Sequence, residues 1–232
     1  MRKFKTWRDP YDMGFTPTYP REIEIQSGLT ILVGCNGAGK TTLLRNIKYE
    51  LKEAKIPYLY YDNLSDGGSN AVSAMFYKGN VEGAVTVWGS SEGEAIGYNI
   101  CNVAGQIREF IITGETEESK EQKKWASMFG KEEETNQEVP KERWILLDAI
   151  DSGYSIDNVV ELKDLINLIF EDSAKVGIDM HILASANAYE LASGENCFDV
   201  NAGKYLTFES YDDYKKFILK SRKKKDKRYK QT

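Results

Sequence analysis

The chain has 232 residues, of which 41% are hydrophobic and 29% are charged, and its formal net charge is −5. This length can bury a sizeable core, so we expect one large α/β domain. No apolar run approaches the roughly 20 residues of a membrane span, and the N-terminal segment lacks the apolar stretch of a secretory signal. From these two absences we expect no membrane partner. The three cysteines are far apart and match no metal spacing, so a cytoplasmic protein with free thiols is expected.

The clearest motif follows residues 29–34, LTILVG, an apolar run that predicts a buried strand. The segment GCNGAGKT, from Gly34 to Thr41, matches G-x-x-x-x-G-K-[ST]. Apolar residues then recur at helical spacing, at Leu43, Leu44, Ile47 and Leu51. A strand, a glycine-rich turn and a helix in this order predict a phosphate-binding loop.

The residue types of this loop suit a nucleoside triphosphate with Mg²⁺. Its glycines let backbone N–H groups turn inward around a phosphate, and the following helix adds the positive end of its dipole. Lys40 would reach the β- and γ-phosphates, and the Thr41 hydroxyl would be a Mg²⁺ ligand. The nucleotide-binding residues expected in the loop are Asn36, Gly37, Ala38, Gly39, Lys40, Thr41 and Thr42.

Residues 90–94, SSEGE, precede another expected helix. Ser91 followed by Glu94 fits a helical capping box, which by itself explains the pattern. Ser91 and Gly93 would also offer a hydroxyl and a backbone N–H at a helix start, which suits an anion. Both interpretations stay open from these residues.

Residues 144–148, WILLD, are an apolar run that predicts a strand ending at Asp148. A carboxylate at that point would hold Mg²⁺ and its water shell. Asp157 lies close to the next expected helix and is a candidate N-cap. His181 begins a further expected strand, where we expect a surface or strand-end position rather than a catalytic one.

Charge is spread unevenly along the chain. Residues 113–142 are highly charged and poor in apolar residues, which predicts a solvated helix pair or a mobile insertion within one domain of residues 1–210. Residues 211–232 hold 10 Lys or Arg against 3 Asp, so this tail carries +7 and the rest of the chain −12. The basic stretch 215–230 is a candidate contact for nucleic acid, and a solvated, frayed helix is an equally supported alternative.

Together these segments resemble the ATP-binding-cassette (ABC) superfamily, in particular its soluble branch of chromosome-maintenance and DNA-repair ATPases. The loop GCNGAGKTTLL is similar to the cassette phosphate loop, SSEGE resembles the signature LSGGQ, and residues 148–157, DAIDSGYSID, resemble DEIDSGLSID. The resemblance covers most of residues 20–195. It implies a P-loop NTPase fold, which is a mixed α/β sheet flanked by helices with a small antiparallel β part on the N-terminal side. Residues 63–90 carry no heptads, so the coiled coil of some relatives is not expected.

The resemblance also implies a homodimer that closes on ATP. In the family, the signature of one subunit completes the ATP site of the other, so Ser91, Gly93 and Glu94 would meet ATP bound to a second copy. Ser155 and Asp157 would lie in a loop that meets its twin across the dimer.

Three positions depart from the family pattern. Ala149 stands where a general-base glutamate would activate water, so we expect hydrolysis to be impaired while ATP binding survives. A naturally slow clamp and an engineered substitution both explain it, and the close match to DEIDSG favours the second. Asn187 stands at the switch-histidine position, where its amide can donate to phosphate but carries no charge. No glutamine lies between residues 27 and 105, which leaves Asn63, or Asp62, as the glutamine-loop substitute.

The sequence therefore predicts an ABC-type ATPase that couples its nucleotide state to a nucleic-acid or protein partner. The resemblance alone implies a phage, mobile-element or defence setting. A P-loop kinase for a small molecule or nucleotide is one alternative, disfavoured because Arg45, Arg108 and Arg143 are scattered. A non-hydrolysing ATP-gated adaptor or clamp is the other alternative.

Overall fold

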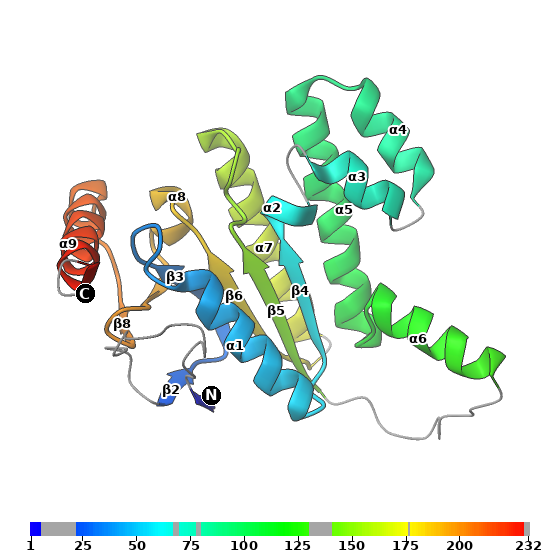
Figure 1. The fold of residues 1–232 in the computed structure, drawn as a ribbon, viewed down its shortest axis with the longest axis horizontal. Coiled ribbons are helices and arrows are strands. Elements are labelled where there is room, and N and C mark those ends of the chain that lie inside the picture. The colour runs from blue at the N-terminus through cyan, green and yellow to red at the C-terminus, as the bar shows by residue number, and fades with distance from the viewer. Residues whose placement is uncertain (6–21, 67–69, 78–79, 130–140, 176, 230–232) are drawn as a thin grey trace.

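The chain folds around a six-stranded sheet flanked by helices (Figure 1), as a computed structural model shows. The structure describes residues 1–5, 22–66, 70–77, 80–129, 141–175 and 177–229. The strands of the six-stranded sheet are β3 (Gly28–Val33), β4 (Tyr58–Asp62), β5 (Glu142–Asp148), β6 (Asp179–Ser185), β7 (Asn196–Asp199) and β8 (Lys204–Leu206). Their spatial order is β4-β5-β6-β3-β7-β8. Every neighbouring pair is parallel except β7 and β8. This confirms the predicted mixed α/β sheet.

A second, two-stranded antiparallel sheet pairs β1 (Arg2–Lys5) with β2 (Glu22–Ile25), which confirms the expected small antiparallel part. The Phe4 ring of β1 packs edge-on against Trp144 of β5 at 5.0 Å between centroids. Trp144 in turn stacks on His181 at 4.0 Å. His181 is only 1% exposed, so the expected surface position is wrong. The sequence does not reveal that the small sheet packs against Trp144 or that Trp144 stacks on His181.

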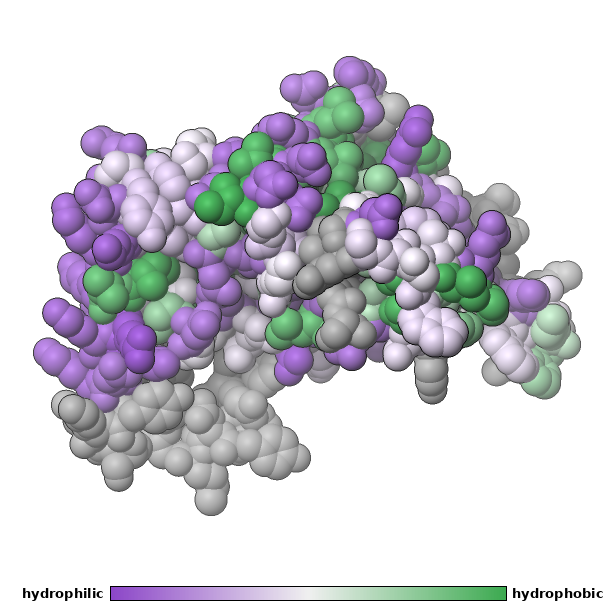
Figure 2. Space-filling model, turned by 90° about the horizontal axis from the view of Figure 1, so that it is seen from above, coloured by the Kyte–Doolittle hydropathy of each residue, from purple (hydrophilic) through white to green (hydrophobic). Residues whose placement is uncertain are grey.

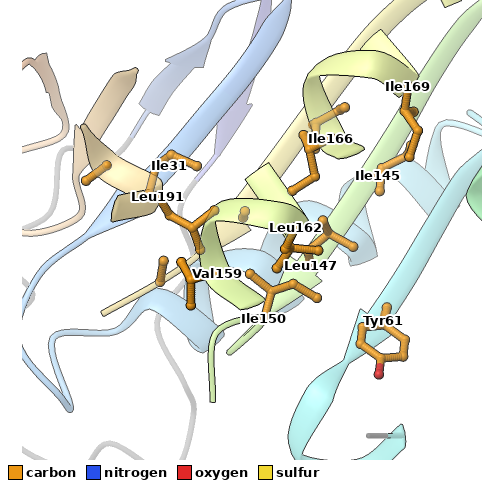
Figure 3. Packing of buried hydrophobic residues seen from close by; sticks show 14 of the residues in the cluster. Ile31, Tyr61, Ile145, Leu147, Ile150, Val159, Leu162, Ile166, Ile169 and Leu191 are labelled. Carbon is orange, nitrogen blue, oxygen red and sulfur yellow. The ribbon is translucent and has the colours of Figure 1, made fainter. Parts of the chain in front are cut away.

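The large sheet is buried on both faces, which explains why its strands read as continuous apolar runs. One face packs against α5 (Glu92–Thr113), α7 (Ile156–Lys175) and α8 (Tyr189–Ala192), as Figure 3 shows for Ile31, Leu147 and the α7 residues around Leu162. The other face packs against α1 (Lys40–Glu53) through Leu32, Leu146 and their neighbours. Alternate side chains of each strand therefore enter different layers of the core.

A group of short helices lies beyond the β4 edge of the sheet (Figure 1). It comprises α2 (Asn63–Asp66), α3 (Ala71–Tyr77) and α4 (Val81–Gly89). It has a small core of its own, made by Ala71, Met75, Ala84 and Val87. Helix α6 (Glu117–Met128) follows α5 within the predicted charged insertion, of which residues 130–140 lie outside the described part.

The basic C-terminal segment forms α9 (Tyr211–Tyr229). Tyr214 and Ser221 are buried, and Phe217 and Ile218 pack against the core, so the frayed-helix alternative does not hold for these residues. Across the described ranges, no helix is both long enough and apolar enough to cross a membrane.

Candidate nucleotide-binding site

The turn between β3 and α1 has the glycine-dependent geometry that a phosphate loop requires. A Cβ on Gly34 would lie 2.9 Å from Cβ of Ala38 and 3.0 Å from Cγ2 of Val200, so no larger residue fits there. Gly39, directly before α1, has a φ of 104°, which L-residues rarely adopt. The predicted strand, turn and helix are therefore all present, with Lys40 as the first residue of α1.

Lys40 is buried and is held by two neutral oxygen atoms. Its Nζ donates to the carbonyl oxygen of Gly34 at 2.8 Å and to Oδ1 of Asn187 at 3.0 Å. Burial lowers the pKa of Lys40, and the nearby Asp151 opposes that shift most strongly. A phosphate oxygen would be a stronger partner for this ammonium than an amide or carbonyl oxygen. Asn187 accepts from Lys40 through Oδ1, and donation from its Nδ2 to a phosphate stays a prediction.

Asp148 ends β5 almost fully buried, and its carboxylate accepts hydrogen bonds from three hydroxyl groups. Oδ1 lies 2.5 Å from Oγ of Ser185 and 3.2 Å from Oγ1 of Thr41, and Oδ2 lies 3.4 Å from the hydroxyl of Tyr60. The structure therefore brings together Thr41 and Asp148, the two proposed metal ligands, from elements far apart in the sequence.

This pair of oxygen donors fits Mg²⁺. Protein sites for Mg²⁺ commonly supply one or two oxygen ligands and leave the rest to substrate phosphates and water. Among the described residues, no group of three or more His, Cys, Asp or Glu side chains is placed to hold a metal. Thr41 and Asp148 would hold the ion, which when bound neutralises phosphate charge.

Tyr60 belongs to the site although no sequence motif indicates it. Burial, with a smaller contribution from Asp148, raises its pKa to about 12, so its hydroxyl keeps its proton and donates to Asp148. Nζ of Lys48 lies 4.4 Å from the centroid of the same ring. The contact arises because β4 pairs in parallel with β5, and the sequence does not reveal that pairing.

Ala149 lies at a strained turn just after Asp148. It has a φ of 49°, uncommon for a residue with a side chain, and its N–H donates to Oγ of Ser185 at 2.8 Å. Nδ2 of Asn63 donates to the carbonyl oxygens of Ala149 at 3.2 Å and Ser152 at 2.9 Å. Asn63 therefore lies beside Ala149 and holds this turn, while its suggested contact with metal or water stays a prediction.

The segment that carries Asn187 is fixed from two directions. Oδ2 of Asp151 accepts hydrogen bonds from the backbone N–H groups of Asn187 at 2.7 Å and Ala188 at 2.6 Å. The hydroxyl of Tyr214 on α9 donates to the carbonyl oxygen of Asn187 at 2.8 Å. No motif in the sequence indicates these roles of Asp151 and Tyr214, although Asp151 lies inside the DAIDSG segment.

Ser91 forms the capping contacts that were one of its two interpretations. The Glu94 carboxylate accepts from the backbone N–H of Ser91 at 2.8 Å and from its hydroxyl at 2.7 Å, which lowers the pKa of Glu94. Helix α5, which contains Gly93, begins among the helices beyond β4, whereas the phosphate loop follows β3, three strands away (Figure 1). The structure thus does not bring Ser91 to Lys40 within one chain.

The segment at the start of α7 is exposed. Ser155 occupies the N-cap position, because the N–H of Val159 donates to its carbonyl oxygen at 3.0 Å. Its hydroxyl contacts the side-chain oxygens of Asp157 and Asn158, and the contact with Asp157 lowers the pKa of that carboxyl. Asp157 lies in the first turn of α7, so its suggested N-cap role falls to Ser155.

No protein-family model matches the chain, and no curated protein matches it. One similar solved structure is that of cbiO1 from Clostridium perfringens, described as part of the ABC transporter complex cbiONQ. The two are 19% identical with a TM-score of 0.41, over 88% of this chain and 86% of that chain. A likeness of this extent does not assign the chain to a family.

Proposed function

We propose that this chain binds a nucleoside triphosphate with Mg²⁺, ATP by its sequence resemblance, as an ATPase of the ABC type. The observation that carries the proposal is the convergence of Lys40, Thr41 and Asp148 at the ends of β3 and β5. An ammonium, a hydroxyl and a carboxylate at a glycine-rich helix start are the groups that phosphate-loop proteins use for Mg-nucleotide. The first two lie at the loop, and the carboxylate is already directed at the hydroxyl.

The experiment for nucleotide binding is calorimetric titration with Mg-ATP. Lys40→Met removes the ammonium but keeps most of the side chain, and we expect it to abolish measurable binding. Lys52→Met removes the same charge from an exposed position in the last turn of the same helix, and should bind like the native chain. Equal binding by all three proteins would refute the proposed site.

We further propose that two copies close around ATP. The start of α5 lies away from the phosphate loop of its own chain, as it must if Ser91, Gly93 and Glu94 serve a second copy. Exposed Ser155 and Asp157 would then lie in the contact between copies. ATP would stabilise the closed state because only that state surrounds the terminal phosphate from both sides.

The proposed output is a change in how the chain contacts a nucleic-acid or protein partner. Helix α9 presents exposed basic side chains at one end of the molecule, where Figure 2 shows hydrophilic residues gathered. They are Lys215, Lys216, Lys220, Arg222, Lys223, Lys224 and Lys227. Such a surface suits a phosphate backbone or an acidic protein.

A further inference from the structure

One face of α9 contacts two loops of the candidate site, the phosphate loop and the loop that carries Asn187. The buried Ser221 accepts at Oγ from the backbone N–H of Cys35 at 3.1 Å and from Nδ2 of Asn201 at 3.0 Å. Seven residues earlier, about two helical turns, Tyr214 donates to the carbonyl oxygen of Asn187. The basic helix is therefore fixed against the phosphate loop itself.

Lys225 lies one further turn along this face. Its Nζ donates to the carbonyl oxygen of Asn36 at 3.0 Å, within the phosphate loop. A Cβ built on Gly37 would lie 3.6 Å from the same Nζ, so the ammonium also lies close to Gly37. Asn36 and Gly37 are both exposed, which leaves this side of the loop open to a ligand.

Lys225 differs from Lys223 in lying against the phosphate loop. Lys223, two positions earlier and so on nearly the opposite side of the helix, is exposed. Within the described part of the chain, Lys225 forms no ion pair, and its contact is a neutral carbonyl oxygen. An ammonium prefers a phosphate oxygen to such a partner.

We infer that Lys225 is a second cation of the nucleotide site and favours a nucleoside triphosphate over the diphosphate. The inference rests on the proposed nucleotide binding at Lys40. Lys40 meets the loop at Gly34 and Lys225 meets it at Asn36, so two ammonium groups contact the same short turn. A triphosphate carries more negative charge than a diphosphate, so an added cation beside the loop stabilises the triphosphate more.

The test compares the dissociation constants of Mg-ATP and Mg-ADP, measured by calorimetry on the native chain and four variants. We expect Lys225→Met to weaken Mg-ATP by about tenfold, as for one lost charged contact, and Mg-ADP by much less. Lys225→Arg keeps the charge and should retain most of the preference for ATP. Lys223→Met removes one charge from the opposite side of α9 and should change neither constant.

Two results would overturn the inference while leaving the proposed function intact. If Lys225→Met weakened ATP and ADP equally, Lys225 would only support the loop. If it changed neither constant, Lys225 would not act on the nucleotide at all. Ser221→Ala distinguishes structural support of the loop from the effect of charge. It removes the hydrogen bond from the Cys35 N–H without changing the charge of the chain, so it should weaken the binding of both nucleotides alike. Failure of the native chain to bind either nucleotide would overturn the proposed function, and this inference with it.

Discussion

The hydroxyl of Thr41 at the start of α1 lies 3.2 Å from a carboxylate oxygen of Asp148 at the end of β5. These two oxygen donors are 107 positions apart in the sequence and meet because β6 alone separates β5 from β3 in the sheet. A metal ion between them would also reach phosphates held by the loop. The pair therefore links the phosphate loop to the acidic strand.

From this pair we predict that Asp148→Asn selectively removes the effect of Mg²⁺ on nucleotide binding. We expect ATP affinity in Mg²⁺ to fall by about tenfold, as for a charged contact, and affinity in EDTA to change little. Calorimetry in both buffers measures this. Asp172→Asn, an exposed carboxyl on α7, serves as the control. If Mg²⁺ raised the ATP affinity of Asp148→Asn as much as that of the native chain, Asp148 would be ruled out as a Mg²⁺ ligand.

Restoring a carboxylate at Ala149 should restore turnover. We expect Ala149→Glu to raise the rate of phosphate release by about 10²–10⁴-fold, the usual contribution of a general base. Ala149→Gln has a similar size without the base and should stay slow. If neither variant released phosphate while both bound ATP, the non-hydrolysing clamp would be the better account.

The close contacts at Gly34 predict a loss of stability on adding one methyl group. Gly34→Ala would place Cβ 2.9 Å from Ala38 and 3.0 Å from Val200, and we expect the free energy of unfolding to fall by about 1–3 kcal/mol. Gly105→Ala lies in the exposed interior of α5, where the new Cβ meets nothing within 4 Å apart from its chain neighbours and the backbone of its own helix, and it should instead raise the free energy of unfolding by up to about 1 kcal/mol. Urea unfolding measures both changes. A neutral Gly34→Ala would contradict the loop geometry.

The burial of His181 predicts a loss of stability in acid. Burial lowers its pKa below the ordinary 6.5, partly opposed by its hydrogen bond to the carbonyl oxygen of Gln26 and by Asp179. As pH falls below about 6.5, the unfolded chain binds a proton that the folded chain does not, so the free energy of unfolding decreases. We expect this decrease between pH 7.5 and pH 5.5 to be smaller in His181→Phe, measured by urea unfolding. If the free energy of unfolding depended on pH equally in both proteins, His181 would not be the source of the loss of stability in acid.

The local part of the site could be predicted from sequence because each motif lies within one short segment. The strand before Gly34, the helix from Lys40 and the strand ending at Asp148 follow from apolar spacing and glycine positions. The mixed sheet was expected from the resemblance of these motifs to the ABC superfamily.

The contacts between segments could not be predicted in this way. Tyr60 reaches Asp148 only because β4 pairs with β5, and His181 is buried because Trp144 stacks on it. Lys225 was one of ten basic residues in the tail, and nothing in its spacing distinguished it from the others. Its contact with Asn36 depends on how α9 packs against the core.

The most direct test of the account is the mass of the chain by light scattering, with and without Mg-ATP. We predict a monomer without nucleotide and a dimer with it. Ser91→Arg should stay monomeric with Mg-ATP, because a large charged side chain would block the contact between α5 and the nucleotide of the other copy. A chain that binds ATP but stays monomeric, or a dimer indifferent to both ATP and Ser91, would contradict the proposed closure.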